Sequence, residues 1–317
     1  MLALEINNLT KDYTVGFWRK RPVRALDRLN LQVGVGESFG FLGPNGAGKT
    51  TTLKILMRLI YPSVGDAKIL GCALDDMKMR ARIGYLPEQP YFYDYLTARE
   101  LLMYCARIFG MNKTDAVKRA DILLERVGLV EAADKQLRKY SKGMLQRAGL
   151  AQALVNDPEV LFLDEPMSGL DPLGRREVRD LIASLREQGK TVFFSSHVLS
   201  DVEALCDRVA IMNKGCLIDS GKLSDILKSQ TSEMEAIVSN VSEAVLNELR
   251  VFALSVIPTP EGARVRLNSE REIERMLGVI HRAGGRLVSV NSVRESLEDL
   301  FVREVSENTK AAQQTAS

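Results

Sequence analysis

The chain has 317 residues, of which 45% are hydrophobic and 26% charged, with a formal net charge of +2. This length allows one large domain and a smaller one, and the composition is that of a globular protein. The small net charge provides no argument for nucleic-acid binding. No apolar run approaches the ~20 residues of a membrane-spanning helix, and the N-terminus lacks a signal-peptide pattern. We therefore expect any membrane role to come through a partner, and we expect the four scattered cysteines to be reduced thiols.

The first 36 residues are predicted to form short strands. Between Leu26 and Val33 apolar residues alternate in part with polar ones, which is typical of half-buried strands. The apolar run Ser38–Leu42 that follows is predicted to be a short buried strand.

A glycine-rich motif joins this strand to a predicted helix. The motif is a Gly, four residues and then Gly-Lys-Thr, namely Gly43-Pro44-Asn45-Gly46-Ala47-Gly48-Lys49-Thr50. The helix is predicted because apolar residues follow at i, i+3, i+4 and i+7, at Leu53, Leu56, Met57 and Ile60. The glycines let backbone N–H groups face an anion, and the helix N-terminus adds a partial positive charge. Lys49 would reach the β- and γ-phosphates and the Thr50 hydroxyl would ligate Mg²⁺, so the motif predicts binding of a nucleoside triphosphate.

Between residues 39 and 221, strands are predicted to alternate with helices, which is typical of a mainly parallel sheet. The nearly continuous apolar runs Val160–Leu163 and Thr191–Phe194 suit central strands that are covered on both faces. The segment 95–153 carries apolar residues at helical spacing throughout, and we interpret it as a helical insertion into the sheet domain.

A second unit is predicted to begin near Thr231. Its expected elements are a strand at 235–238, a helix at 242–249, a hairpin of 251–257 and 263–267, a helix ending before 284, and a strand at 287–290. Ser269 and Glu272 form the capping box of the second helix. The order βαββαβ is the ferredoxin-like pattern. The polar tail 306–317 is expected to be disordered.

Two adjacent carboxylates, Asp164 and Glu165, end the buried run at 160–163. At the carboxyl end of a sheet strand Asp164 is placed to hold Mg²⁺, and Glu165 could take a proton from an attacking water. His197 follows the second buried run. A lone histidine at a strand end is more often structural, but His197 could face the same sheet edge and approach the γ-phosphate.

Taken with Ser141-Lys142-Gly143-Met144 and Ser168-Gly169-Leu170-Asp171, these segments resemble the ATP-binding subunit of an ABC transporter over roughly residues 1–225. The resemblance implies an α/β fold of the P-loop NTPase type. This fold has a RecA-like core, an N-terminal antiparallel β subdomain and a helical subdomain at about 95–153, followed here by the small α+β domain at 231–305. It also implies that two copies enclose two ATP molecules.

The resemblance assigns roles residue by residue. Ser141 and the helix after Gly143 would bind the γ-phosphate of ATP held by the other copy, the 168–171 segment is the D-loop across the dimer seam, and His197 is the switch histidine. Tyr13 falls where the family places an aromatic that stacks on adenine, although it could instead pack in the core. The residues expected to contact ATP are Tyr13, Gly43, Pro44, Asn45, Gly46, Ala47, Gly48, Lys49, Thr50, Thr51, Ser141, Gly143 and Asp171.

The sequence departs from the family pattern at two places. The usual signature is Leu-Ser-Gly-Gly-Gln, but here Tyr140, Lys142 and Met144 replace its first, third and fifth residues. Lys142 would either add positive charge near the phosphates or point to solvent. Glu88 occupies the position of the family's switch glutamine, and Gln89 follows one residue late. Glu88 could still ligate Mg²⁺, because a carboxylate is a better cation ligand than an amide. We keep both as catalytic and metal-binding candidates, Glu88 favoured by its position and Gln89 by its chemistry.

Tyr91, Phe92 and Tyr93 belong to an aromatic cluster in a chain with only 6% aromatic residues. The resemblance places this region at the groove for a helix of a membrane-spanning permease, although the rings could also fill the protein's own core. The C-terminal unit, with its ending 296–301, resembles an appendage of drug, sodium and polysaccharide exporters. We therefore expect an ATPase at the cytoplasmic face of the cell membrane that serves export. The alternative is an ATP-switched interaction protein without a membrane partner.

Overall fold

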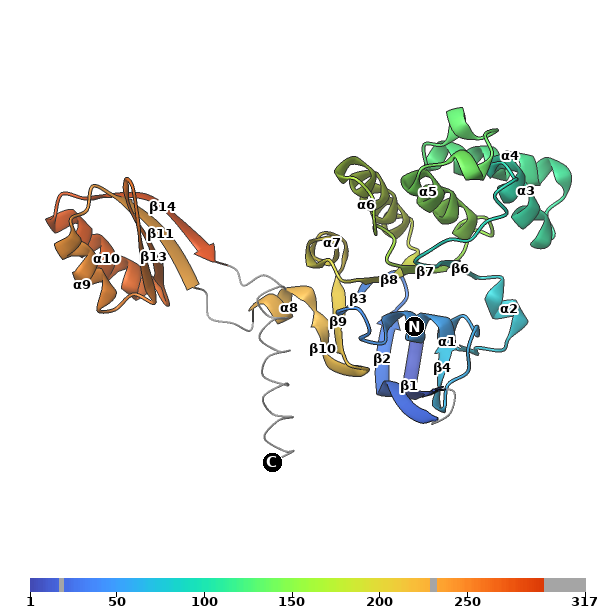
Figure 1. The fold of residues 1–317 in the computed structure, drawn as a ribbon, viewed down its shortest axis with the longest axis horizontal. Coiled ribbons are helices and arrows are strands. Elements are labelled where there is room, and N and C mark those ends of the chain that lie inside the picture. Colours follow the sequence, from blue (N-terminus) through green and yellow to red (C-terminus); the bar gives the residue numbers. More distant parts are fainter. Residues whose placement is uncertain (17–19, 229–232, 294–317) are drawn as a thin grey trace. The chain divides into compact units, whose positions relative to one another are not determined.

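The structure of the protein, a computed structural model, describes residues 1–16, 20–228 and 233–293 (Figure 1). The chain divides into two compact units, Met1–Leu223 and Ser224–Ser317. The expected tail 306–317 and the segment 296–301 lie outside the described residues. Within the described ranges, no helix is both long enough and apolar enough to cross a membrane.

A six-stranded sheet forms the centre of the first unit (Figure 1). Its order is β10-β9-β3-β8-β7-β6, where the strands are β3 (Ser38–Leu42), β6 (Ile83–Leu86), β7 (Val160–Asp164), β8 (Thr191–Ser196), β9 (Arg208–Asn213) and β10 (Cys216–Lys222). Only β10 pairs antiparallel. The mainly parallel sheet expected from the apolar runs is confirmed, and β3, β7 and β8 are buried at every position.

Four phenylalanine rings pack at the centre of this sheet. Phe193 on β8 lies 5.6 Å from Phe39, 5.2 Å from Phe41 and 5.7 Å from Phe162, measured between ring centroids. All four side chains are buried. Such ring pairs add to the free energy gained by burying the rings, so Phe193 joins β3 and β7 through β8.

A second, antiparallel sheet of order β2-β1-β4-β5 packs on the same core. Its strands are β1 (Leu2–Val15), β2 (Arg21–Gly34), β4 (Val64–Ile69) and β5 (Cys72–Ala73). The expectation of short strands is wrong here, because β1 and β2 are 14 residues long and stay paired across several register shifts. The bulges interrupt the alternation of apolar and polar residues without ending the strands.

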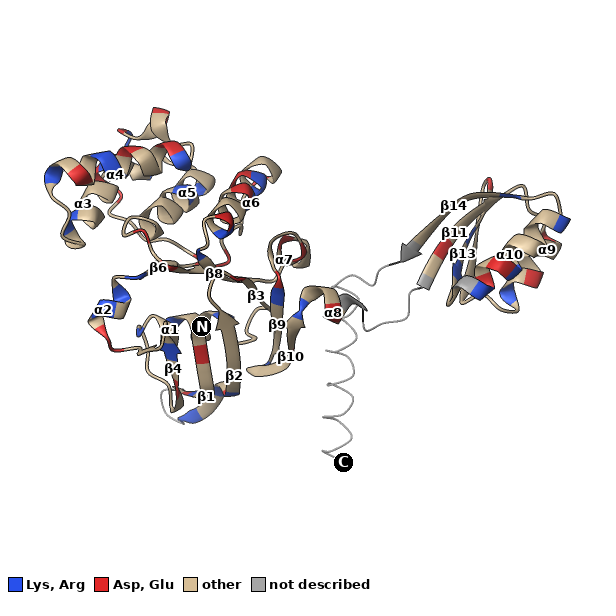
Figure 2. Cartoon of the chain, turned by 180° about the vertical axis from the view of Figure 1, so that it is seen from behind, with Lys and Arg blue, Asp and Glu red and all other residues tan. Residues whose placement is uncertain are grey.

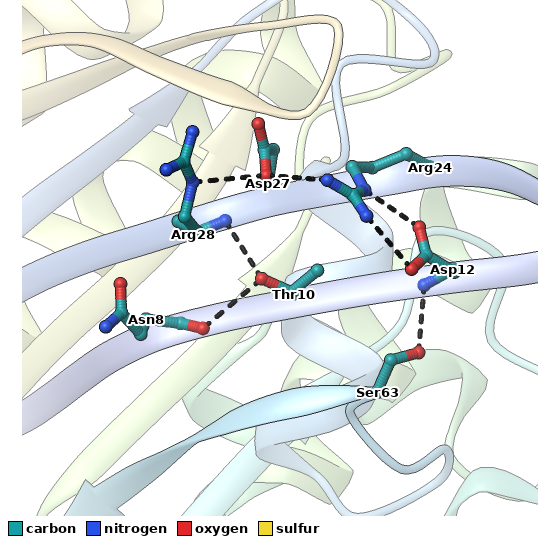
Figure 3. A network of polar contacts seen from close by, with 7 residues as sticks. All are labelled: Asn8, Thr10, Asp12, Arg24, Asp27, Arg28 and Ser63. Atoms are coloured by element: carbon teal, nitrogen blue, oxygen red, sulfur yellow. Dashed lines mark hydrogen bonds and ion pairs between the residues drawn. The ribbon is translucent and has the colours of Figure 1, made fainter.

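Polar contacts hold these bulges in place (Figure 3). Asn8 and Arg28 both have left-handed backbone conformations. The Thr10 hydroxyl links them, since it donates to the Asn8 carbonyl oxygen and accepts from the Arg28 N–H. Arg24 donates to Asp12 on the facing strand and to Asp27 on its own. The network satisfies backbone groups that the shifted ladder leaves unpaired.

Helices cover the sheets of the first unit. They are α1 (Lys49–Leu56), α2 (Met77–Arg80), α3 (Ala98–Ile108), α4 (Lys113–Arg126), α5 (Lys142–Ala153), α6 (Pro172–Glu187) and α7 (Leu199–Leu205). Figure 1 shows α3, α4 and α5 grouped together beside α6 and away from the antiparallel sheet. These three helices, with two short 3₁₀ turns at Val130–Ala132 and Leu137–Lys139, occupy most of the segment expected to be a helical insertion.

Helix α1 is shorter than the apolar stripe predicts. It ends at Leu56 because Arg58 adopts a left-handed conformation, with φ of 58°. The Arg58 N–H then bonds the Ile55 carbonyl and the Leu59 N–H bonds the Lys54 carbonyl, which is the Schellman arrangement of a helix end. Met57 and Ile60 lie beyond the helix but still pack against the core.

The second unit has the element order β11 (Glu233–Ser239), α9 (Glu243–Arg250), β12 (Ser255–Thr259), β13 (Gly262–Leu267), α10 (Glu270–Arg282) and β14 (Arg286–Val293), after the short helix α8 (Leu223–Lys228). The sheet order is β12-β13-β11-β14, and every pairing is antiparallel. Buried residues of α9 and α10 form one core with the strands. Figure 2 shows charges of both signs along α10.

Two boundaries of this unit differ from the sequence expectation. Residues 251–253 do not begin a strand, because the Val251, Phe252 and Ala253 N–H groups close the end of α9 on the carbonyls of Glu248 and Leu249. Pro258 lies inside β12 instead of in the hairpin loop. An edge strand tolerates a proline, since the missing N–H can face away from the ladder.

We predict that Phe193→Ala destabilises the first unit by about 3–5 kcal/mol, because it leaves a cavity where three other rings meet. A urea titration that follows the unfolding transition of this unit measures the change. Phe109→Ala removes a ring of the same size that is 45% exposed, and it should shift the transition far less. Equal shifts for the two variants would contradict the central role of the Phe193 ring.

Candidate functional site

The glycine-rich motif forms the loop between β3 and α1. Gly46 and Gly48 have φ of 82° and 104°, conformations that other residues rarely adopt. A Cβ atom on Gly48 would lie only 2.7 Å from the Ala25 carbonyl oxygen, so this position also lacks room for a side chain. Lys49, at the start of α1, is 5% exposed and its Nζ donates to the Gly43 carbonyl at 2.6 Å. The sequence therefore builds a tight loop around one buried ammonium group.

This loop borders a cavity of about 450 Å³, which we call the loop cavity. Residues from five separate segments line it: Ala25, Pro44, Asn45, Gly46, Ala47, Gly48, Lys49, Thr50, Thr51, Glu88, Glu165, Ser168 and His197. Of the expected nucleotide-contacting residues of the motif, those at 44–51 line the loop cavity, together with the catalytic candidates Glu88, Glu165 and His197.

Glu165 lies at the centre of the charged groups. Its Oε1 is 3.4 Å from Lys49 Nζ, and its Oε2 is 2.8 Å from His197 Nδ1. The carboxylate is buried, and the backbone is in the left-handed region with φ of 48°. A non-glycine residue in this region costs free energy, so the surrounding contacts must hold it there. This geometry aims the Glu165 carboxylate into the loop cavity.

Asp164 is 1% exposed and is held by the neighbouring strand β8. The Ser195 hydroxyl donates to Asp164 Oδ1 at 2.5 Å and accepts from the Glu165 N–H at 3.1 Å. Burial raises the pKa of Asp164, the Ser195 and Thr50 hydroxyls lower it, and the Glu165 and Glu88 carboxylates raise it further. Among the described residues no group completes a hydrogen bond to Asp164 Oδ2. A buried anionic oxygen without a partner, beside a hydroxyl and a second carboxylate, fits a divalent cation.

The two switch candidates lie in different surroundings. Both Glu88 and Gln89 are exposed, but Glu88 lines the loop cavity and Gln89 is not among the lining residues. The Glu88 carboxylate is also close enough to act on the pKa of Asp164.

Tyr13 is not among the residues that line the loop cavity. It lies half-buried on β1 opposite Val23 of β2, with the Lys11 ammonium 5.2 Å from its ring centroid. Ala25, two residues further along β2, does line the cavity. Tyr13 is therefore on the strand pair that reaches the cavity, beside it and not within it.

Ser141, Gly143 and Asp171 also lie outside the loop cavity of their own chain. Ser141 caps α5 by accepting from the Met144 N–H at 3.3 Å, and Asp171 caps α6 by accepting from the Gly174 N–H at 2.9 Å. Both side chains belong to exposed residues at helix N-termini. A single chain thus brings together the loop, the carboxylates and His197, but not these three residues.

The aromatic cluster is open to solvent. Tyr91 is 96% and Tyr93 57% exposed, whereas Phe92 is partly buried. The Tyr93 ring packs on that of Tyr95, with 5.8 Å between the ring centroids. The tyrosines therefore do not fill the protein's own core.

Sequence reasoning missed Ser195 and Ala25, and it assigned Ser168 only to the D-loop segment across the dimer seam. Ser195 bonds the Asp164 carboxylate and the Glu165 backbone N–H, whereas Ser168 and Ala25 line the loop cavity. Ser195 could have been found from its position at the end of the second buried run. If the two runs are neighbouring parallel strands, their register places Ser195 opposite Asp164, as the structure shows. No local pattern distinguishes Ala25 from other strand alanines.

Comparison with known proteins places the site in a family context. The family model described as ABC transporter matches residues 26–168. An uncharacterized ABC transporter ATP-binding protein, sll0415 of Synechocystis, is 45% identical over 96% of this chain and 85% of its own length. The bacitracin transport ATP-binding protein BcrA of Bacillus licheniformis is 38% identical over 88% of this chain and 92% of its own length. The match to BcrA is longer than the first unit of the fold, so it includes part of the second unit.

A solved structure resembles the first unit. The ATP-binding cassette MJ0796, in a dimeric post-hydrolysis state bound to ADP and Pi, superposes with a TM-score of 0.64 at 28% identity. The superposition covers 69% of this chain and 98% of that one.

We predict that Asp164→Asn raises the melting temperature of the nucleotide-free protein by ~2–4 °C, because it removes a buried charge that lacks a full set of partners. The pKa of Asp164 in the fold lies above the unfolded value, so the full penalty is present above the folded pKa, decreases as pH falls below it, and vanishes only below the unfolded pKa. The difference between variant and wild type should therefore shrink at acidic pH. Thermal melts at a series of pH values measure it.

Asp180→Asn provides the matched control for this measurement. Asp180 is exposed on α6, with its carboxylate 4.0 Å from Arg176, and its replacement should change stability by no more than about 0.5 kcal/mol. A melting temperature lowered by Asp164→Asn would show that the charged form is well compensated in the fold.

Proposed function

Because this chain belongs to the family of ABC transporter ATP-binding proteins, we propose that its loop cavity holds ATP through the residues described above. The chain is an ATPase subunit that couples nucleotide binding and hydrolysis to transport. The convergence of Lys49, Glu165 and His197 on one cavity is the observation that carries the assignment of roles.

The phosphates would lie against the loop. Backbone N–H groups of Asn45, Gly46 and Gly48, together with the N-terminus of α1, provide partial positive charge. Lys49 is already held at this point by the Gly43 carbonyl and Glu165. Its ammonium group would exchange these contacts for the β- and γ-phosphate oxygens, while Thr51 lines the same wall.

Thr50, Asp164 and Glu88 would hold Mg²⁺, with Gln89 as the less favourably placed candidate. When bound, the ion neutralises charge on the β- and γ-phosphates. The free Oδ2 of Asp164 supports this set, as does the position of Glu88 in the cavity. Ser195 would hold Asp164 through Oδ1 and so leave Oδ2 for the ion.

Glu165 would act as the general base. Its carboxylate takes a proton from the attacking water, and the oxygen–phosphorus bond then forms as the bond to ADP breaks. His197 holds Glu165 through Nδ1. To hold the γ-phosphate as well, the ring must also donate from Nε2, which requires the imidazolium form.

A second copy of the chain would complete the cavity. Ser141, Gly143 and Asp171 lie outside their own cavity, at exposed helix N-termini where they are available to another chain. The dimeric state of the similar cassette supports this arrangement.

Tyr13 would stack on the adenine of ATP. It lies on the β1–β2 strand pair, which also carries the cavity-lining Ala25, so the base would bind beside the cavity.

The exposed tyrosines would contact a membrane-spanning permease. Tyr91 and Tyr93 offer large amphipathic surfaces of the kind that fill interface cores, with Phe92 partly buried between them. Binding there would hold the chain at the cytoplasmic face of the cell membrane. This proposal is favoured over an ATP-switched protein without a membrane partner, since the relatives are named as transporter subunits.

Export is the proposed direction of transport. The bacitracin transport relative matches beyond the first unit, so it shares part of the C-terminal appendage that suggested an exporter subgroup. The small α+β unit at 231–305 would act as an accessory to the ATPase domain at 1–225.

We predict that Glu165→Gln lowers Mg-ATP turnover by about 10²–10⁴-fold, because the amide cannot accept the proton of the attacking water. The same variant should accumulate as an ATP-bound dimer, which light scattering coupled to gel filtration measures. Glu187→Gln, an exposed glutamate of α6, serves as the control and should behave as wild type. Turnover close to wild type in Glu165→Gln would remove this residue as the base.

The membrane partner is tested separately. We predict that the double variant Tyr91→Ala/Tyr93→Ala lowers the ratio of membrane-bound to free protein in the producing cells by about tenfold. This corresponds to a loss of ~1.4 kcal/mol in binding free energy. Fractionation of the cells measures this ratio, and ATP binding by the purified variant should stay unchanged. Tyr61→Ala, at a tyrosine whose exposure is similar to that of Tyr93, is the control. A double variant that remains in the membrane fraction would contradict the proposed docking surface.

A further inference from the structure

The side chain of Lys142 lies across Gly169 in the same chain. A Cβ atom built on Gly169 would overlap Lys142 Nζ and would lie 2.7 Å from Cε and 3.0 Å from Cδ. Lys142 is the first residue of α5, directly after Ser141, and Gly169 belongs to the loop 168–171 that precedes α6. The stem of this lysine therefore covers the backbone of that loop, an arrangement common for long charged side chains.

Gly169 is suited to this contact for two reasons. It has φ of 68°, where other residues are strained, and it leaves open the space that the lysine stem fills. Both the left-handed conformation of Gly169 and its contact with Lys142 therefore depend on the absence of a side chain at residue 169.

Two further contacts join α5 to the loop and to α6. A Cβ on Gly143 would lie 3.5 Å from Leu170 Cδ2, so the first turn of α5 packs against the loop. One helical turn later, Arg147 forms an ion pair with Glu177 of α6 at 3.2 Å. The N-terminal half of α5 and the 168–171 loop therefore form one packed block.

The other end of this block reaches the loop cavity. Ser168 lines the cavity, and its N–H bonds the Glu165 carbonyl at 3.0 Å. A change at the cavity wall would therefore be transmitted along residues 168 and 169 to Lys142, and from there to Ser141.

We propose that Lys142 is a positioning residue that couples the two ATP sites of the dimer. Its stem ties the loop of one chain's own cavity to the Ser141 segment that serves the other chain's ATP. This inference rests on the proposed function, because it requires a cavity shared between two copies. Lys142 acts through Gly169 and needs no contact with the nucleotide.

The test is the ATP dependence of turnover in Lys142→Ala, Lys142→Met and the control Lys139→Ala, an exposed lysine of the preceding 3₁₀ turn. Wild type should show a Hill coefficient above 1, with an upper limit of about 2 for two sites. Lys142→Ala should fall toward 1, whereas Lys142→Met keeps the stem and should retain most of the cooperativity. ATP affinity of single chains, measured at concentrations too low for dimers, should be the same in all variants.

Gly169→Ala offers a second route to the same contact, and thermal melts confirm that each variant is folded. Gly169→Ala should also lower the Hill coefficient, and combining it with Lys142→Ala should add little, because both changes remove one contact. A Lys142→Ala protein with the Hill coefficient of wild type overturns this inference and leaves the proposed function standing. Wild-type turnover that is non-cooperative and unchanged by dilution overturns the shared cavity, and this inference with it.

Discussion

Two adjacent buried carboxylates at the end of β7 are the constraint around which the first unit is arranged. Burying charge costs free energy unless it is paired and hydrogen-bonded. Ser195 provides such a partner from β8, Lys49 from the start of α1, and His197 from the position directly after β8. Parallel strands bring their carboxyl ends to one edge, so all three partners reach the Asp164–Glu165 pair only because β3, β8 and β7 are neighbours.

The two carboxylates at this sheet edge do not have a full set of hydrogen-bonding and charged partners, and this leaves groups available to a ligand. Asp164 Oδ2 has no described hydrogen-bond partner, and Glu165 occupies a strained backbone conformation. Such features persist where the surrounding structure over-determines them. Here the aromatic packing of Phe193 with three other rings lies beneath the edge in the same strands. The rigid core therefore holds a site whose charges are completed by ligands.

The same fold leaves part of the chemistry unfinished within one chain. Ser141 and Asp171 cap their helices and lie outside their own cavity, while the 168–171 loop connects both regions. The residues at the two helix N-termini are therefore as relevant to the function of the ATPase as those that line its cavity. The second unit has its own sheet and its own core, which is why its β-strands could be recognised independently of the site.

The sequence by itself determined the features that depend on neighbours along the chain. The loop at 43–50, the buried strands at β3, β7 and β8, and the carboxylates after β7 follow from spacing and apolar runs, since such signals are local. Local signals failed where a single contact overrode periodicity, at the Arg58 helix end, at the bulges of β1 and β2, and at the end of α9. Only the tertiary structure placed Ser195 against the Asp164 carboxylate and the Glu165 N–H, and put Glu88 but not Gln89 in the cavity. It also decided that Tyr91 is exposed and that Lys142 lies over Gly169. These outcomes depend on strand register and on packing between residues far apart in the chain, which no local pattern encodes.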